Sequence, residues 1–317
     1  MGYKASIFLI LFLLLQGCEK ESSTPIKMAI NPWPGYEFLY LADKKGFFKD
    51  VGLNIQLLQL VSLADTQRAY TKGQVDGLAS TLIEAVQAQP LGGKALKIVL
   101  VPDYSNGGDV IISGPGITDV KQLKGKRVGA EIASLGIYVL ERALSKAGLT
   151  LADVSLVNIE QAQGEKAMQD ARIDAFVSYP PVSVTLLRNE GYQKIFGSDE
   201  IPREIIDTVS FSVDVIEKNP GLVGKFRQAW QMALEYADAH KDESYQIMAQ
   251  REGISKAEFA ATLEDLIILD MEEQSRLFGT ADVLQSAVID VCKTMVHVKS
   301  IEVDCDNYPD IIYRKNK

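Results

Sequence analysis

From residue 26 onward, short apolar runs alternate with stretches whose apolar residues recur at helical spacing, and this alternation most narrows what the chain can fold into. Strands are predicted at residues 27–30, 53–60, 75–80 and 97–102. Helices are predicted between them at residues 36–45, 65–72 and 82–89. Strands that alternate with helices form βαβ units, so the pattern predicts an α/β fold with a largely parallel sheet.

The same rhythm restarts after SNGGDVIISGPGI at residues 105–117, as though a second domain had begun. Further strands are predicted at residues 124–131, 154–159 and 173–181, and helices at 134–147 and 164–172. A return strand is expected at residues 208–216, and the chain from Pro220 is expected to be almost wholly helical.

This layout predicts two Rossmann-like lobes with a cleft between them. Lobe 1 is expected to be discontinuous, with residues 26–108 and 209–317, including the C-terminal helices. Lobe 2 is expected at residues 109–208, inserted into lobe 1. The two crossings between the lobes predict a hinge near residues 109–113 and 208–213, about which a ligand would close the cleft.

The N-terminus has the charged, apolar and small-residue order of a secretory signal. Lys4 precedes an apolar run at residues 7–15, and Gln16, Gly17 and Cys18 follow it. That run is about half the ~20 residues needed to span a hydrocarbon core. We therefore expect residues 1–17 to be a signal peptide and the mature protein to leave the cytoplasm.

The segment LLQGC resembles the bacterial lipobox, which implies lipidation of Cys18; the alternative is an ordinary signal peptide with an incidental cysteine. Polar residues 18–25 then form a lipidated tether. The expected location is the periplasm, with a lipid anchor in a membrane facing it. Glu19 leaves open whether that membrane is the inner or the outer one.

Composition excludes some partners. About 300 residues remain after the signal, enough to bury real cores. The chain has 42 acidic against 33 basic residues. An acidic surface repels phosphate backbones, so we expect no nucleic-acid partner.

The two cysteines beyond Cys18 are Cys292 and Cys305, an even pair near the C-terminus. In an oxidising compartment such a pair predicts a disulfide, and the alternative is two reduced thiols. A zinc site is disfavoured because only His297 is nearby and CxxC spacing is absent, so no metal is expected.

The order of several segments resembles the type II periplasmic solute-binding proteins of the sulfonate, taurine, nitrate and thiamine-precursor group. The segments are INPWPGYEFLYLADKKGFFKDVGLNI, TQRAYTKGQVDGLASTLIEAV, ITDVKQLKGKRVGAE, SLGIYVLERALSKAGL and MQDARIDAFVSYPP. The resemblance implies a substrate-binding protein of an ABC transporter. It implies a small-molecule ligand and a permease as partners, and we expect a monomer without a cofactor.

Ligands of open parallel sheets bind beyond the carboxyl ends of strands, where helix N-termini lie. The loops at those ends therefore supply the candidate ligand-binding residues, which are Trp33, Gly35, Tyr36, Ser80, Thr81, Glu84, Tyr104, Ser134, Ser178 and Tyr179. The same loops carry Asp103, Asp109, Glu131 and Leu135. Structural roles are the alternative: a turn for Trp33, and helix caps for Ser80, Thr81 and Ser134.

Two ligand chemistries stay open. Helix N-termini with Ser80, Thr81 and Ser134 suit a sulfonate, nitrate or carboxylate. The aromatic side chains, with Glu84, Asp103 or Asp109, suit an amine or a flat nitrogen heterocycle. The absence of Lys or Arg from the predicted strand ends favours an amine, a zwitterion or an aromatic heterocycle.

Two other functions compete with transport. The fold also resembles enzymes of thiamine-precursor and menaquinone synthesis. However, His240 and His297 are the only histidines, and no cysteine lies between Cys18 and Cys292, so a nucleophilic triad at the cleft is hard to build and no enzyme is expected. The second alternative is a periplasmic ligand-sensing subunit for a membrane kinase or cyclase.

Overall fold

The first three strands pair in parallel, as their alternation with helices requires. The computed structural model describes residues 24–279 and 281–314. Its first sheet has the order β2-β1-β3-β11-β4, in which β11 runs antiparallel to both of its neighbours. The strands are β1 Ile26–Ile30, β2 Ile55–Gln59, β3 Gly77–Thr81, β4 Leu96–Leu100 and β11 Asp207–Ser212. We call this sheet with its helices lobe 1.

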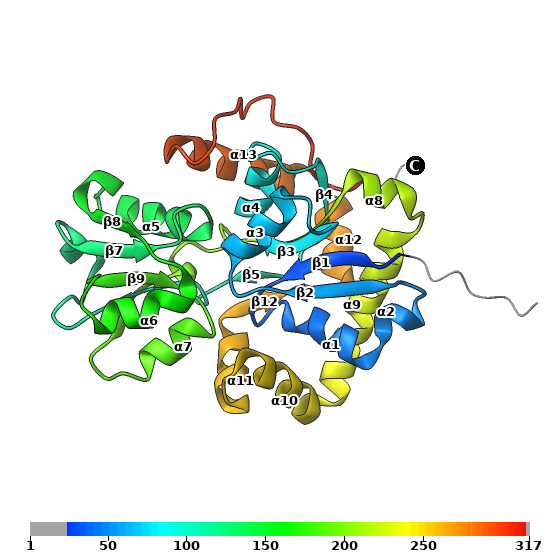
Figure 1. Ribbon diagram of the computed structural model, residues 1–317, viewed down its shortest axis with the longest axis horizontal. Coiled ribbons are helices and arrows are strands. Elements are labelled where there is room, and N and C mark those ends of the chain that lie inside the picture. Colours follow the sequence, from blue (N-terminus) through cyan, green and yellow to red (C-terminus); the bar gives the residue numbers. More distant parts are fainter. Residues whose placement is uncertain (1–23, 280, 315–317) are drawn as a thin grey trace, which may run out of the picture.

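A second sheet has the order β10-β6-β9-β7-β8, with parallel pairing among β7, β8 and β9 and antiparallel pairing of β6 with β9 and β10. We call this sheet with its helices lobe 2, the green part of Figure 1. Its strands are β6 Val110–Ser113, β7 Arg127–Ala130, β8 Ser155–Asn158, β9 Ala175–Ser178 and β10 Gln193–Gly197.

Helices flank both sheets (Figure 1). In lobe 2 they are α5 Leu135–Lys146, α6 Gln161–Gln169 and α7 Val182–Leu187. In the first part of lobe 1 they are α1 Glu37–Lys45, α2 Phe47–Asp50, α3 Leu63–Thr71 and α4 Leu82–Ala88. The later ones are α8 Val213–Lys218, α9 Leu222–Ala239, α10 Lys241–Glu252, α11 Lys256–Glu264, α12 Met271–Gly279 and α13 Ala281–His297. No helix in the described ranges is long and apolar enough to cross a membrane.

The predicted fold, two α/β lobes with a helical C-terminal part, is confirmed, but two local predictions are wrong. Helix was expected almost throughout the chain from Pro220, but α11 ends at Glu264, and Leu266–Ile268 forms strand β12, which pairs with β5, Asp103–Ser105. The return strand expected through residue 216 ends at Ser212, where α8 begins. Apolar runs this short fit a strand or a helix equally well by periodicity alone.

The chain crosses between the sheets before the predicted hinge segments. Residues 110–113 and 207–212 form strands β6 and β11, whose ladder hydrogen bonds fix the backbone. The crossings are instead residues 106–109 and 198–206. Ser198 joins them, because its hydroxyl lies 2.7 Å from that of Ser105 and accepts from the Gly107 N–H at 2.6 Å.

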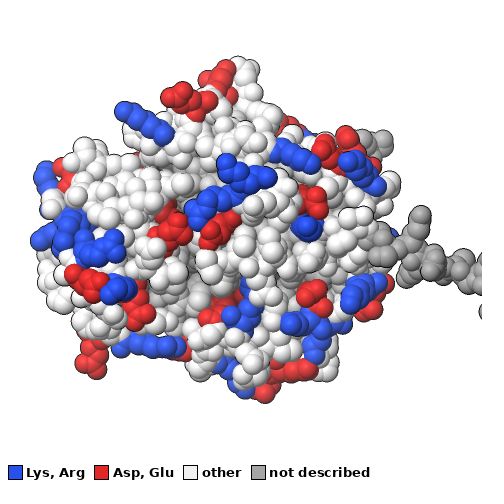
Figure 2. All heavy atoms as spheres, in the orientation of Figure 1, with Lys and Arg blue, Asp and Glu red and all other residues white. Residues whose placement is uncertain are grey.

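Charge of both signs is interspersed over the face shown in Figure 2, although the net charge is −9. Two ion pairs join the lobes near their surface: Arg68 with Glu160 at 3.3 Å and Arg188 with Glu258 at 2.8 Å. Exposed pairs of this kind contribute about 0–1 kcal/mol each. The closed arrangement therefore depends on contacts deeper in the interface.

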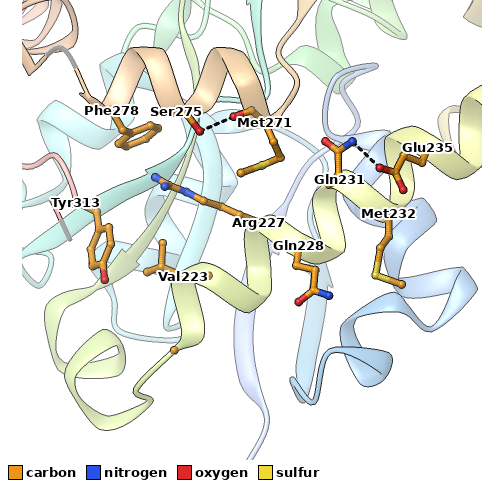
Figure 3. Close-up of a pocket in the computed structure, with 12 residues that line it drawn as sticks. Val223, Arg227, Gln228, Gln231, Met232, Glu235, Met271, Ser275, Phe278 and Tyr313 are labelled. Atoms are coloured by element: carbon orange, nitrogen blue, oxygen red, sulfur yellow. Dashed lines mark hydrogen bonds between the residues drawn. The ribbon is translucent and has the colours of Figure 1, made fainter.

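A groove on the outer side of lobe 1 runs between α9 and α12 (Figure 3). The Arg227 guanidinium lies 4.2 Å from the centre of the Phe278 ring, and its Nε donates to the Val99 carbonyl at 2.6 Å. Every residue that lines this groove belongs to lobe 1. A solute bound there would not contact lobe 2.

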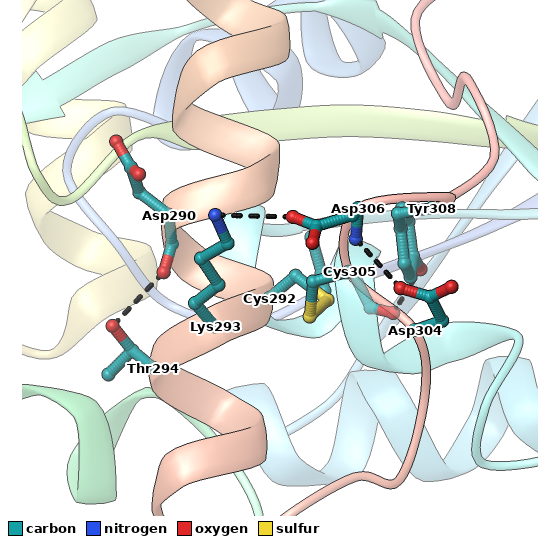
Figure 4. The surroundings of a disulfide bond; sticks show 9 residues. Asp290, Cys292, Lys293, Thr294, Asp304, Cys305, Asp306 and Tyr308 are labelled. Carbon is teal, nitrogen blue, oxygen red and sulfur yellow. Dashed lines mark hydrogen bonds and ion pairs between the residues drawn. A yellow bond between two sulfur atoms is a disulfide. The ribbon is translucent and has the colours of Figure 1, made fainter.

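From residue 298 to residue 314 the chain forms turns and irregular backbone rather than helix, in contrast to the prediction for the C-terminal part. Ile312 bridges to Ile98 on the edge strand β4, and the Tyr308 hydroxyl donates to the Val86 carbonyl of α4. A disulfide between Cys292 and Cys305 ties this segment to α13 (Figure 4). The segment thereby covers the sheet edge and one end of α4.

We predict that reducing this disulfide lowers the free energy of unfolding by about 3 kcal/mol, the chain-entropy value for a loop of roughly 15 residues. Urea denaturation with and without reductant measures the loss. The double variant Cys292→Ala/Cys305→Ala is the control, since its stability should not respond to reductant. Equal responses of the two proteins would contradict the prediction.

Candidate functional site

A small cavity lies where the two lobes meet. Lobe 2 and the crossing that leads into it supply Leu135 and Asp109. The other lining residues come from lobe 1: Asn31, Trp33, Tyr36, Leu63, Thr81 and Asp207. Both lobes therefore form its wall, and a solute inside it would contact both.

The turn between β1 and α1 provides the aromatic side of the cavity. The Trp33 Nε1–H donates to Asp103 at 3.3 Å, and the Tyr36 hydroxyl donates to Asp207. A Cβ on Gly35 would lie 1.9 Å from an Asp103 carboxylate oxygen, so only glycine fits at this position. These contacts fix both rings before any solute enters.

Glu84 connects the two lobes. Its Oε2 accepts from the Thr81 N–H at 2.9 Å, which completes the capping box of α4 in lobe 1. Its Oε1 accepts from the Leu135 N–H at 2.8 Å and from the Ser134 hydroxyl at 2.6 Å, at the N-terminus of α5 in lobe 2. One buried carboxylate thus caps a helix in each lobe.

Tyr179 makes a second contact across the interface. Its hydroxyl accepts from the Leu63 N–H at 3.1 Å, at the start of α3 in lobe 1. Its ring packs edge-on against Trp33, with centroids 6.2 Å apart. Tyr179 therefore holds the aromatic turn of lobe 1 against lobe 2.

The structure brings only part of the predicted set to the cavity. Trp33, Tyr36 and Thr81 line it, and so do Asp109 and Leu135. Gly35, Glu84, Ser134 and Tyr179 support its wall through the contacts above. Three predicted residues do not line the cavity, and their polar or aromatic groups contact other parts of the protein: Ser80 with the Thr81 carbonyl, Ser178 with Gln161, and Tyr104 with Arg203.

Sequence reasoning missed Asn31, Leu63 and Asp207. Asn31 directly follows β1, and Leu63 follows Ser62, the N-cap of α3, so both carry a position signal. Asp207 carries no such position signal, because it lies at the start of a strand and not at the end of one. Since β11 is antiparallel to β3, Asp207 pairs with Thr81 and lies at the same sheet edge.

Five carboxyl groups are buried in and around the cavity: Glu84, Asp103, Asp109, Glu131 and Asp207. None of them forms an ion pair within residues 24–279 and 281–314. Burial raises the pKa of Asp103, Asp109 and Glu131 to about 7 each. Burial, then repulsion from Asp103, raises the pKa of Asp207 well above its ordinary value. The closed cleft is therefore short of positive charge.

Two α/β lobes that enclose a small cavity define the periplasmic binding protein fold. The aliphatic sulfonate-binding protein SsuA of Escherichia coli has this fold and is 18% identical, with a TM-score of 0.73 over 93% of this chain and 94% of that one. The alkanesulfonate-binding protein of Xanthomonas axonopodis bound to MOPS is 16% identical, with a TM-score of 0.73 over 89% and 96%.

Residues 33–244 match the NMT1/THI5 like family, and the chain belongs to it. A protein of Brucella abortus described as a binding protein is 26% identical over 299 residues, 87% of each chain. A 4-amino-5-hydroxymethyl-2-methylpyrimidine phosphate synthase of Candida albicans is 25% identical over 221 residues, 65% of each chain. The resemblance to this group of binding proteins that the sequence indicated is confirmed.

We predict that Glu84→Gln destabilises the closed protein by about 1–3 kcal/mol. Both oxygens of Glu84 accept from backbone N–H groups, so the amide nitrogen of glutamine would face a donor in either orientation. Thermal unfolding and the radius of gyration measure the loss and any opening. Ser134→Ala is the matched comparison, because it removes one hydroxyl donor at the same contact. A loss from Glu84→Gln no larger than that from Ser134→Ala would contradict the bridging role.

We predict that Asp109→Asn stabilises the ligand-free protein more at about pH 8 than at about pH 5. A raised carboxyl pKa means that the folded protein binds more protons than the unfolded chain between about pH 4 and pH 7. The stability contributed by this group is therefore present at low pH and lost as pH rises toward the folded pKa of about 7.

The expected gain at about pH 8 is roughly 1–4 kcal/mol, since each unit by which the pKa is raised corresponds to about 1.4 kcal/mol. Urea denaturation at the two pH values measures it. Asp43→Asn, the same change on the exposed side of α1, is the control and should be neutral at both. A variant that is equally or less stable than the wild type at the higher pH argues against burial of a charged Asp109.

Proposed function

We propose that this protein is an extracytoplasmic solute-binding protein that captures a small organic solute by closing its two lobes. The cavity supports this proposal most directly, because both lobes line it and two buried contacts cross the interface beside it. A cleft that closes only when its solute contacts both lobes converts binding into a change of shape. The crossings at residues 106–109 and 198–206 are the proposed hinge.

The proposed partner is the permease of an ABC importer. The binding proteins with the same fold support this role, and so does the Brucella abortus relative. The proposed location is the periplasm, with a lipid on Cys18 as anchor. Cys18 and the signal sequence lie outside the described residues, so this part of the proposal depends on the sequence alone.

Binding without chemistry is the proposed activity, although some relatives are synthases of a pyrimidine phosphate. Within the described chain, no His, Cys or Lys lines the cavity. These are the side chains that most often supply a nucleophile or a general base near neutral pH. The lining instead offers aromatic rings and oxygen acceptors, which suit recognition.

Small-angle scattering tests the proposal. We expect the radius of gyration to decrease when a solute that raises the melting temperature is added, drawn from sulfonates, nitrate, amines, amino acids and pyrimidines. The melting temperature must rise because such a solute binds only the folded state. Glu84→Gln should compact less at the same solute concentration. Solute binding without any change in the radius of gyration would contradict capture by closure.

A further inference from the structure

We propose that the cleft binds a small organic cation whose primary ammonium group is held between Asp109, Asp207 and Asn31. This inference depends on the proposed function, since it names the class of solute for the same cavity. It rests on the hydrogen-bonding capacity of the lining, the missing counter-charge, the occupied helix N-termini and the aromatic wall of the cavity.

The cavity offers acceptors that no fixed N–H or O–H of the protein satisfies. They are Asn31 Oδ1, Asp109 Oδ2 and Asp207 Oδ2, on residues that are 0%, 2% and 1% exposed. Two other polar atoms of these residues are used: Asn31 Nδ2 donates to the Pro32 carbonyl, and Asp207 Oδ1 accepts from Tyr36. A primary ammonium has three donors and no acceptor, so it matches three acceptors in one cavity.

Outside the cavity, the protein pairs one fully buried acid with a cation. Glu37, 0% exposed, forms an ion pair with Arg251. Asp109 and Asp207 have the same burial and no such partner in the described residues. Asp103 lies beside Asp207, so one proton shared by these two carboxyls leaves the pair with one negative charge. A buried charge is costly unless it is paired, and a cationic solute would supply the missing partner.

An anion has no comparable place in this cleft. The N-terminus of α5 is the position where a sulfonate or carboxylate would find free N–H groups. Here the Glu84 carboxylate already accepts from the Leu135 N–H and the Ser134 hydroxyl. The N-terminus of α3 is also engaged, because the Leu63 N–H donates to Tyr179. An added anion would face Asp109 and Asp207 instead of donors.

The aromatic wall of the cavity narrows the class of solute further. Trp33 and Tyr36 form one wall with ring centroids 6.5 Å apart, and an ammonium or the methylenes beside it can pack on these faces. An amine whose ammonium carries a short alkyl chain or a single ring matches this wall.

The cation would also couple binding to closure. Asp207 belongs to lobe 1, and Asp109 leads into lobe 2. Without a cation, bringing these carboxylates together adds repulsion to the cost of burying them. An ammonium between them reverses the sign of that contribution, so bound solute shifts the protein further toward the closed state.

Thermal unfolding with three probes of similar size tests the inference at equal concentrations: n-butylammonium, 1-butanol and ethanesulfonate. Benzylammonium is added as a ring-bearing cation. We expect one or both ammonium ions to raise the melting temperature and the alcohol and the sulfonate to leave it unchanged. The inference is overturned if neither ammonium ion raises the melting temperature, or if the alcohol or the sulfonate raises it as much.

Variants locate the site. Asp109→Asn and Asp207→Asn should each weaken binding of the effective ammonium ion at least about tenfold, the effect of losing one hydrogen bond to a charged group. The same variants should not lower the ligand-free melting temperature at about pH 8, since they remove unpaired buried charge. Asp43→Asn is the control for the chemical change. Unchanged affinity in both site variants would place the ammonium elsewhere and overturn the assignment.

Scattering of the same samples separates this inference from the proposed function. Compaction with ethanesulfonate but not with an ammonium ion would support capture by closure and overturn the cation assignment. Ammonium binding that depends on Asp109 but causes no compaction would support the cation site and contradict capture by closure.

Discussion

The carboxylate of Glu84 is the interaction on which the closed arrangement most depends. It accepts backbone N–H groups from the first turn of α4 in lobe 1 and from the first turn of α5 in lobe 2. Helix N-termini carry unpaired donors and partial positive charge, so one carboxylate between two of them is stabilised from both sides. The position of lobe 2 relative to the cavity follows from this contact and from Tyr179.

Asp103, Asp109 and Asp207 accept no hydrogen bond from a helix N-terminus in the described residues. Burial raises the pKa values of Asp103 and Asp109 to about 7 each, and it raises the pKa of Asp207 well above its ordinary value. Closing the empty cleft therefore either takes up protons or buries unpaired charge. This makes the closed state of the ligand-free protein costly near neutral pH, and that cost is what allows a solute to control closure.

The sequence was sufficient for the architecture because the alternation of strands and helices is a local pattern. It placed Trp33, Tyr36 and Thr81 at the carboxyl ends of parallel strands, where the cavity lies. It could not place Asp207, because the antiparallel direction of β11 follows from pairing between distant segments. It also predicted Glu84 as a ligand contact, whereas the structure shows its carboxylate bonded to the other lobe. Contacts between the lobes depend on how the two lobes pack against each other. A local sequence pattern carries no information about that packing.

Proton release on binding tests the central claim most directly. In the closed cleft the pKa of these carboxyls lies at about 7, so a cation that pairs with them must drive off the protons that the empty closed cleft holds near that pH. Titration calorimetry of n-butylammonium or benzylammonium, in two buffers with different ionisation enthalpies near pH 7, measures the number released. The account predicts net release, reduced in Asp109→Asn. Binding with no proton transfer, or with proton uptake, would contradict it.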